Sequence, residues 1–329
     1  MKKLFIGIDI SKDVFDFLGI TEDGEVALAN GVCNNDAPGI KHFIKSLKRH
    51  STYDVHICME HTGHYGFLLT TEFTLAAIKF SLINPLEIKH SVGLVRGKTD
   101  AVDAYRIAKY ALTHKHDLKL YQLPIKEIQQ LKALISLREG YVKIMVQLKN
   151  SLKAFEIIAI SVPLKKQLKQ HQKLIAEQEK AIANIEEQMK EIIENNDDLR
   201  SSYKKITSVI GVGPLTGIKC IIETENFTRF NNPRKFACHC GLAPFEYQSG
   251  SSIRKRTKTS PIRDKSLKSI LFKAASSAIQ HDPQLKNYYK RKTEAGKHKL
   301  SVLNAIANKI VLRIFAVAKR KEPFVKLAA

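Results

Sequence analysis

Residues 3–13 read KLFIGIDISKD, and this stretch decides the fold that the sequence predicts. Its apolar run 4–8 is short and has polar residues on both sides, which is typical of a buried β-strand. Asp9 follows the run directly, and a polar turn then leads into a second strand-like run at 14–20. An aspartate at the end of a buried strand is costly unless a partner compensates its charge. Two interpretations stand: Asp9 binds a divalent cation such as Mg2+, or it caps the junction between strand and turn.

Strand-like and helix-like patterns alternate outward from this stretch to about residue 115. Apolar runs at 55–59 and 80–84 predict two further core strands, and residues 21–25 predict a hairpin turn. Between the strands, apolar residues recur at helical spacing. The sequence therefore predicts a mixed α/β domain in which helices cover a sheet, and we place this domain at residues 1–120.

Three further acids stand in positions comparable to that of Asp9. Glu60 ends its apolar run in the same way that Asp9 ends the first strand. Asp100 and Asp103 are spaced i, i+3, so both project from one face of the first turn of a predicted helix. Acidic residues also suit the N-terminal end of a helix dipole, which is the structural alternative for this pair. Two strand-end acids followed by a helix-start pair match the RNase H-like nucleases, in which clustered carboxylates hold two metal ions roughly 3.5–4 Å apart.

Residues 121–198 change in character and predict a helical connector. Proline cannot continue a helix, so Ser161-Val162-Pro163 separates two long helices. Their apolar residues follow coiled-coil spacing, with Met145, Leu148, Leu152 and Phe155 in the first helix and Ile175, Ile182, Ile185, Met189 and Ile192 in the second. This pattern favours a coiled-coil arm through which copies of the chain associate, with a helical-bundle core inside one chain as the alternative.

A mainly α-helical domain is predicted for residues 199–329. Near its start, Gly211-Val212-Gly213-Pro214 separates two helix-like stretches, a pattern that resembles a helix-hairpin-helix motif. In such a motif the backbone N–H groups of the glycine turn bind a phosphate, so Gly211 and Gly213 are candidate nucleic-acid-binding residues. The same pattern also occurs as a plain turn between helices.

Ser249 stands beside Gly250, shortly before a basic run. A serine beside a glycine is usually part of an ordinary loop. A basic run that follows it suits phosphate binding, and a serine in such a place could attack a phosphodiester if its hydroxyl is activated. The candidate phosphate-binding residues of the run are Arg254, Lys255, Arg256 and Lys258.

The formal net charge of +22 is spread unevenly. Residues 250–329 contain 20 lysines and arginines against 4 aspartates and glutamates, a net charge of +16. Such a segment favours a polyanion, most commonly nucleic acid, with a solubilising basic face or an anionic membrane surface as alternatives. No apolar run approaches the ~18–20 residues of a membrane span and no signal peptide is indicated, so we expect a cytoplasmic protein without a membrane partner.

The five cysteines are too few and too scattered for a disulfide framework. Cys238-His239-Cys240 is their one cluster, and it lacks a second pair at zinc-ligand spacing. We interpret this cluster as structural.

Together these motifs resemble the DEDD-type bacterial transposases of the insertion sequence 110 family, and in particular its 1111-like branch. The resemblance covers essentially the whole chain. It rests on FIGIDISKD around Asp9, CMEHTGHY around Glu60, GKTDAVDAYRIA around Asp100 and Asp103, and the run ITSVIGVGPLTG…FACHCGLAPFEYQSGSS. Each motif is weak alone, whereas their order and spacing are highly specific.

The resemblance implies an N-terminal domain similar to Holliday-junction resolvases, with four Mg2+-binding acids at Asp9, Glu60, Asp100 and Asp103. It also implies a serine nucleophile, which we place at Ser249 although Ser251 and Ser252 crowd the position. Members of the family act as homo-oligomers, which implies a dimer or tetramer here. They are guided to donor and target DNA by a structured RNA, so DNA and a guide RNA are the expected partners. The implied chemistry is strand cleavage and rejoining through a transient 5′-phosphoserine bond.

Three other functions compete with this one. A metal-dependent nuclease or junction resolvase would use the four acids and water, with Ser249 structural. An actin-like sugar kinase or ATPase also opens on a Gly-Ile-Asp strand, but the sequence shows no later glycine-rich nucleotide motif. A catalytically inert nucleic-acid-binding protein would leave four well-placed acids unexplained.

Overall fold

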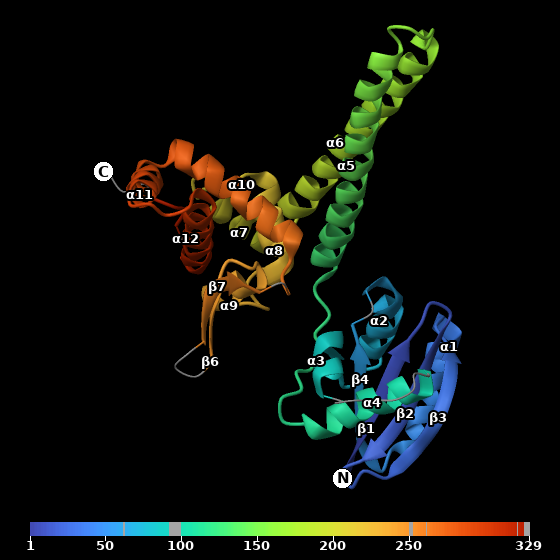
Figure 1. Cartoon of the computed structure of the whole chain (residues 1–329). Helices are drawn as coiled ribbons and strands as arrows, with labels where there is room; N and C mark the ends of the chain where they lie inside the picture. Colours follow the sequence, from blue (N-terminus) through green and yellow to red (C-terminus); the bar gives the residue numbers. More distant parts are fainter. Residues whose placement is uncertain (62, 92–99, 250–252, 261, 321, 326–329) are drawn as a thin grey trace. The chain divides into compact units, whose positions relative to one another are not determined.

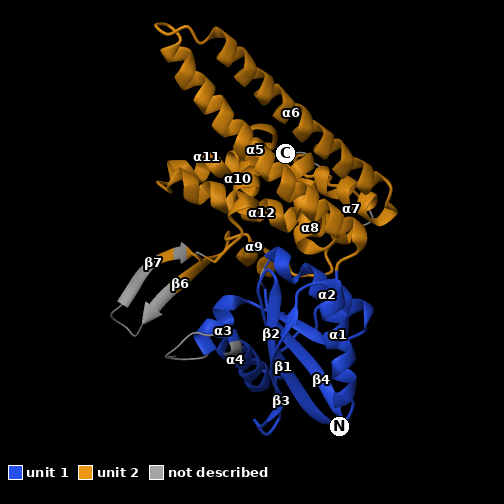
Figure 2. Ribbon diagram, turned by 90° about the vertical axis from the view of Figure 1, so that its right-hand side faces the viewer, with its two compact units in different colours: residues 1–123 blue, residues 124–329 orange. Residues whose placement is uncertain are grey.

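The computed structural model describes residues 1–61, 63–91, 100–249, 253–260, 262–320 and 322–325. Within these ranges, the side chains of residues 101, 247–249, 253–256 and 258 lie outside the description. The chain divides into two compact units, Met1–Leu123 and Pro124–Ala329, which Figure 2 shows in blue and orange. The three-part division with boundaries after residues 120 and 198 stays a prediction.

The first unit is built on a five-stranded sheet with the strand order β3-β2-β1-β4-β5. Its strands are β1 (Lys2–Ile10), β2 (Val14–Thr21), β3 (Val26–Asn34), β4 (Tyr53–Glu60) and β5 (Phe80–Ile83). β1, β2 and β3 pair in antiparallel fashion, whereas β4 pairs in parallel with both β1 and β5. An antiparallel meander with two parallel strands added beside its first strand is the RNase H-like arrangement. The predicted fold class is therefore confirmed.

Helices cover both faces of this sheet. Alternate residues of β1 enter two separate cores, because successive side chains of a strand point to opposite faces. Ile6 and Ile8 belong to a core with residues of α1 (Ala37–Leu47) and α2 (Phe67–Leu75). Phe5 belongs to a core with residues of α3 (Pro85–Ser91) and α4 (Asp100–Thr113). Two short 3-10 turns, η1 (Lys48–His50) and η2 (Gly63–Gly66), complete this unit.

The second unit begins with a helical hairpin of α5 (Lys126–Ile158) and α6 (Lys165–Glu194). The break between them contains the predicted Ser161-Val162-Pro163. Ion pairs of 2.6 Å, Arg138 with Glu186 and Lys149 with Glu179, join the two helices along their length. The near part of the hairpin packs into the core of the unit, and the far part extends away from the unit's other helices (Figure 1).

The rest of the second unit is mainly helical, as predicted. Its helices are α7 (Asp197–Thr207), α8 (Pro214–Thr224), α9 (Pro233–His239), α10 (Lys265–His281), α11 (Pro283–Glu294) and α12 (Lys299–Lys319). A two-stranded hairpin of β6 (Pro244–Ser249) and β7 (Ile253–Thr259) stands between α9 and α10. The sequence analysis predicted mainly helical structure for this region but not the hairpin.

By length and composition, α12 is the single helix among the described residues that is apolar enough to cross a membrane. Its apolar side chains have another use, since 44% of its apolar window is buried inside the unit. Ile306, Ile310 and Ile314 are fully buried and follow helical spacing. We therefore describe α12 as a core helix.

Candidate active site

Asp9 and Glu60 lie at the carboxyl ends of neighbouring parallel strands. The residues directly before them, Ile8 of β1 and Met59 of β4, are paired in register. Because side chains alternate along a strand, both acids lie on the face of the sheet that Cys58 shares with α4. The two acids that follow apolar runs in the sequence are therefore neighbours in space.

Helix α4 brings the other two acids to the same place. It begins at Asp100 and carries Asp103 at the end of its first turn. The next residue, Ala104, is fully buried against the sheet. A Cβ built on Gly7 would lie 2.1 Å from the carbonyl oxygen of Ala104, so β1 and α4 approach each other backbone to backbone. Asp9 lies two residues beyond Gly7 on the same face, which places it beneath the start of α4.

The electrostatics of Asp9 show that the four acids meet. Partial burial raises the pKa of Asp9 to about 6 from an ordinary value of 3.8, with further contributions from the charges of Asp103, Glu60, Asp100 and Asp16 in that order. Like charges disfavour ionisation only when they are close. The structure therefore brings together all four predicted acids of the N-terminal domain.

Asp16 is a fifth acid, which the sequence analysis missed. It pairs directly with Asp9 across the antiparallel strands β1 and β2. Burial, followed by the charge of Asp100, raises its pKa. The sequence did contain a signal, because two strand-like runs joined by a polar turn at 11–13 place residues 9 and 16 opposite each other when the runs pair as a hairpin.

Among the described residues, Arg106 places a positive charge against this acidic group. The guanidinium of Arg106 is 2.5 Å from a carboxylate oxygen of Asp103, one helical turn along α4. Both side chains are about one-fifth exposed, at 17% and 21%. Arg106 therefore holds Asp103 in place and offsets part of its charge.

Asn35 braces the two loops beside the acids. Its side-chain amide donates hydrogen bonds to the carbonyl oxygens of Ser11 and Tyr65, each at 3.0 Å. Ser11 belongs to the turn after Asp9, and Tyr65 to the segment after Glu60. Asn35 is a positioning residue that no local sequence pattern marks.

The acidic group fits divalent metal ions by its chemistry. It offers carboxylate oxygens, which Mg2+ prefers, and burial together with the charges of the neighbouring acids raises the pKa of Asp9.

The predicted serine lies in the second unit. Ser249 is the last residue of β6 and pairs with Ile253 of β7. Ser251 and Ser252 lie outside the described residues. The backbones of the predicted phosphate-binding residues run along β7, while their side chains lie outside the description: Arg254, Lys255, Arg256 and Lys258.

A side-chain network fixes the base of this serine hairpin. His239, just before β6, lies with its Nε2 3.2 Å from a carboxylate oxygen of Glu223 on α8. Asp264, just after β7, donates its backbone N–H to the carbonyl of His239 at 3.1 Å. The carboxylate of Asp264 also accepts a 2.7 Å hydrogen bond from Leu267 as the N-cap of α10. Both ends of the hairpin are thus tied to rigid helices.

Glu223, His239 and Asp264 also form a possible metal-ligand group. Their ligand atoms lie within 4.8 Å of one another. Burial alone would raise the pKa of Glu223, but the hydrogen bond and charge of His239, with Lys132 and Arg229, hold it below its ordinary value. Partners from the chain itself therefore explain this group without an ion. The cysteines of the Cys238-His239-Cys240 cluster are unpaired thiols.

The two predicted glycines of the phosphate-binding turn have different surroundings. Gly211 has a φ of +92°, and a Cβ on it would lie 2.4 Å from the carbonyl oxygen of Ala274 on α10. The need for glycine at this position is therefore explained by backbone packing. Gly213 is the N-cap of α8, and a Cβ on it would meet nothing within 4 Å. Of the pair, Gly213 leaves room for a phosphate near a helix N-terminus.

Comparisons with known proteins cover both units. The model of the DEDD transposases of IS110, described as "Transposase", matches residues 6–155. The model described as "Transposase IS116/IS110/IS902 family" matches residues 203–290.

Individual relatives extend over nearly the whole chain. The pilin gene-inverting protein of Moraxella lacunata is 27% identical over 99% of each chain. The transposase for insertion sequence element IS1111A of Coxiella burnetii is 25% identical, covering 97% of this chain and 90% of the relative. Among solved structures, RuvC of T. thermophilus in complex with a Holliday junction substrate matches with 11% identity and a TM-score of 0.29, covering 36% of this chain and 99% of RuvC.

Proposed function

Because the chain belongs to the IS110 family of DEDD transposases, and is therefore a DNA transposase or recombinase, we propose that it exchanges DNA strands through Ser249 and its four clustered acids. The observation that carries this proposal is the convergence of these acids: Ile8 and Met59, directly before Asp9 and Glu60, are paired in register, and Gly7 of β1 lies against the backbone of α4, which begins at Asp100. The raised pKa of Asp9, which results from burial and then from the charges of Asp103, Glu60 and Asp100, agrees with this geometry. A group of acids that destabilises its own ionised form is typical of a site that binds cations.

The acids act as ligands in this proposal. Asp9, Glu60, Asp100 and Asp103 would hold Mg2+, which would stabilise the charge that develops on the attacked phosphate. Arg106 orients Asp103, and Asn35 holds the loops that follow Asp9 and Glu60. The site is thereby organised before substrate binds, as efficient phosphoryl transfer requires.

Ser249 supplies the nucleophile. Its hydroxyl oxygen would attack the scissile phosphorus, lose its proton to a base, and form a 5′-phosphoserine bond while the 3′ oxygen of the broken strand leaves and takes up a proton. Attack by the 3′ hydroxyl of another strand would reverse these steps and release the serine. The energy of the phosphodiester is kept in the covalent bond, so the exchange needs no ATP.

The proposed partners come from the resemblance to the family, and the charge of the chain is compatible with them. We propose donor and target DNA as substrates, and a structured guide RNA as the partner that selects them, in accord with the net charge of +22. Gly213 and the basic run on β7 would contact phosphates. The protein would act in the cytoplasm as a dimer or tetramer, joined through the far part of the α5–α6 hairpin, where Ile157 and Ile160 are 71% and 83% exposed.

A trapping experiment tests this proposal. The protein would be incubated with Mg2+, the candidate guide RNA and end-labelled donor and target DNA, and the label on denatured protein would be measured. Asp9→Ala, Ser249→Ala, Ser251→Ala and Ser252→Ala variants would run beside the wild type. We expect an adduct that Asp9→Ala and Ser249→Ala both lose and that the two neighbouring serine variants retain.

The same experiment separates the alternative function. A metal-dependent nuclease or resolvase would cleave DNA with no covalent adduct, and Ser249→Ala would leave its cleavage unchanged. An adduct lost only in Ser251→Ala or Ser252→Ala would move the nucleophile to that serine.

A further inference from the structure

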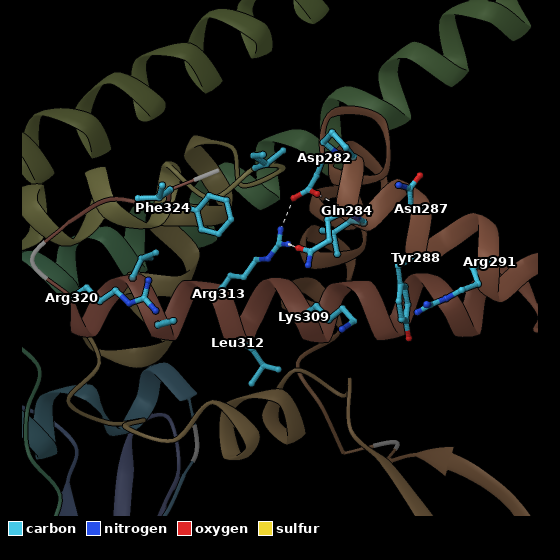
Figure 3. Close-up of a pocket in the computed structure, with 16 residues that line it drawn as sticks. Asp282, Gln284, Asn287, Tyr288, Arg291, Lys309, Leu312, Arg313, Arg320 and Phe324 are labelled. Atoms are coloured by element: carbon cyan, nitrogen blue, oxygen red, sulfur yellow. Dashed lines mark hydrogen bonds and ion pairs between the residues drawn. The ribbon is translucent and has the colours of Figure 1, made fainter. Parts of the chain in front are cut away.

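The second unit contains a large pocket between α11 and α12, with a volume of about 1270 Å³ (Figure 3). Leu285 and Val317, both buried, and Leu312 on α12, which is 42% exposed, line its apolar floor. Tyr288 and Phe324 stand at its two ends, with Arg313 between them. A pocket of this size exceeds the ~300–1,000 Å³ of most small-molecule sites. It therefore suits a ligand made of several linked chemical groups.

The charge of the pocket is positive. Its one acid among the described lining residues, Asp282, is 4% exposed and lies 2.5 Å from the guanidinium of Arg313, which also donates to Gln284 (Figure 3). That pair is therefore neutral and internal to the wall. Three exposed basic side chains remain on the lining, those of Arg291, Lys309 and Arg320.

Aromatic rings lie directly beside these cations. The ammonium of Lys309 is 4.8 Å from the centre of the Tyr288 ring, and the guanidinium of Arg291 is 6.0 Å from it. At the other end, the guanidinium of Arg313 is 5.1 Å from the centre of the Phe324 ring. The backbone N–H of Phe324 donates a 2.8 Å hydrogen bond to Ser208, which fixes that ring against the unit. Rings and cations are thus both held in place in the same pocket.

We propose that this pocket binds unpaired nucleotides of RNA, with a base stacked on Tyr288 and adjacent phosphates bound by Arg291 and Lys309. Aromatic rings beside basic side chains are the combination that binds single-stranded nucleic acid. The neutral side chains of Gln284 and Asn287 on the same wall supply the donors and acceptors that base edges and 2′-hydroxyls require. The inference rests on the proposed use of an RNA partner and assigns that partner a place in the second unit.

The chemistry of the pocket argues against other occupants. A duplex keeps its bases stacked inside the helix, so it would leave the apolar floor and the rings unused. RNA presents unstacked bases in its loops and bulges, and these are the usual targets of specific RNA recognition. An acidic peptide without aromatic residues would satisfy the cations but would leave the rings of Tyr288 and Phe324 without a stacking partner.

A binding assay with matched variants tests the proposal. The full-length protein would be titrated into a fluorescein-labelled RNA hairpin with an unpaired uridine-rich loop, and binding would be followed by anisotropy. Arg291→Gln/Lys309→Gln removes two charges from the pocket. Lys286→Gln/Lys290→Gln removes two charges from exposed positions of α11 that do not line it. We expect the pocket variant to bind at least ~10-fold more weakly than the matched control, because both lose the same net charge.

Two further arms address stacking and the type of nucleic acid. Tyr288→Leu keeps an apolar side chain but removes the ring, and we expect it to weaken RNA binding ~10-fold. Single-stranded DNA of the same sequence and duplex DNA should bind the wild type several-fold more weakly than the RNA. Photocrosslinking of 4-thiouridine in the loop to a peptide of α11 or α12 in the wild-type protein provides a measurement that does not depend on variants folding.

Each outcome decides a separate point. Equal loss of binding in the two double variants, or crosslinks confined to other segments, would overturn the assignment of RNA binding to this pocket. Single-stranded DNA binding as tightly as RNA would overturn the assignment to RNA. Neither result bears on the covalent chemistry, since these titrations contain no cleavable donor or target and the adduct experiment scores Ser249 independently.

Discussion

Gly7 of β1 and Ala104 of α4 meet backbone to backbone, so closely that a Cβ on Gly7 would lie 2.1 Å from the carbonyl oxygen of Ala104. The same Cβ would lie 2.4 Å from the backbone nitrogen of Ala108. Asp9 is two residues from Gly7, and Asp103 is adjacent to Ala104. This backbone contact between strand and helix therefore helps to set the separation of acids that come from distant parts of the sequence.

Gly7→Ala is expected to push α4 away from the sheet. Backbone atoms cannot yield as a flexible side chain can, so we expect a loss of about 3 kcal/mol in the free energy of unfolding. Strand-exchange activity should fall by more than this loss of stability explains, because Asp100 and Asp103 move with the helix. Urea unfolding and the adduct assay measure the two effects.

Gly140→Ala is the control for this substitution. Gly140 lies within α5, and a Cβ on it would meet nothing within 4 Å. Alanine is the better helix former, so this variant should gain about 0.5–1 kcal/mol. A Gly7→Ala protein with wild-type stability would refute the role assigned to the contact.

Asp9→Asn is expected to stabilise the protein at neutral and alkaline pH. The folded-state pKa of Asp9 is raised to about 6, by burial first and then by neighbouring charges, from an ordinary value of 3.8. Ionisation therefore opposes folding, and wild-type stability falls as pH rises from about 4 to 6. Asparagine carries no charge and avoids this loss. Above pH 7 we expect the free energy of unfolding of the variant to exceed that of the wild type by about 1 kcal/mol, after allowance for solvent screening of a half-exposed group.

Thermal unfolding at a series of pH values measures this effect. The melting temperature of Asp9→Asn should exceed that of wild type at pH 8, and the difference should approach zero near pH 4. Asp13→Asn, at an exposed acid of the adjoining turn, serves as the control and should show no such trend. A difference that is constant across this range would argue against charge repulsion at Asp9.

Divalent metal should stabilise the folded chain through the same acids. Binding to the folded state alone raises the free energy of unfolding by about 1.4 kcal/mol when the free metal is about ten times its Kd. We expect Mg2+ or Mn2+ to raise the melting temperature of wild type at pH 8, and to raise that of an Asp9→Asn/Asp103→Asn variant much less. Equal shifts in both proteins would place the metal elsewhere.

Local sequence patterns were enough to predict the strands and the acids at their ends. Asp9 and Glu60 stand out because each ends an apolar strand, and the strands themselves are marked by composition. Asp16 was missed because its relation to Asp9 depends on the register of β1 and β2. The serine hairpin was missed although Phe245 and Tyr247 alternate with polar residues in β6, because the serine beside Gly250 was interpreted as part of a loop and the residues after it as a basic run. The network at its base is invisible in sequence, since Glu223, His239 and Asp264 come from separate helices and meet only through packing.

The network of Glu223, His239 and Asp264 leads to the next prediction. We expect the β6–β7 hairpin to become less ordered in Glu223→Gln. Its hydrogen bond with His239 and nearby positive charges hold the pKa of Glu223 below the ordinary 4.5 despite burial, so ionisation stabilises the fold above that pH. Neutralising Glu223 should cost about 1–2 kcal/mol at pH 7, and the cost should disappear as the pH falls through the lowered pKa of Glu223. Hydrogen exchange of β6 and β7 should become faster in the variant.

Glu225→Gln is the matched control for the hairpin variant. Burial raises the pKa of Glu225, so its charge opposes folding and its removal should not destabilise the chain. Destabilisation of the same size in Glu223→Gln and Glu225→Gln would show that the bond to His239 has no particular role.

The far part of the α5–α6 hairpin should determine the oligomeric state. Apolar side chains in α5 and the turn after it remain exposed in the isolated chain: Phe155 at 45%, Ile157 at 71%, Ile158 at 46% and Ile160 at 83%. A second copy of the chain would cover these side chains, and their removal from water would stabilise the association. Ile157→Glu/Ile160→Glu should therefore lower the mass measured by light scattering after gel filtration, with little change in the helical signal, because neither side chain belongs to the core of one chain.

Gln167→Glu/Gln170→Glu adds the same charge at exposed polar positions of α6 and should leave the mass unchanged. An unchanged mass in the isoleucine variant would show that copies of this chain associate through another surface.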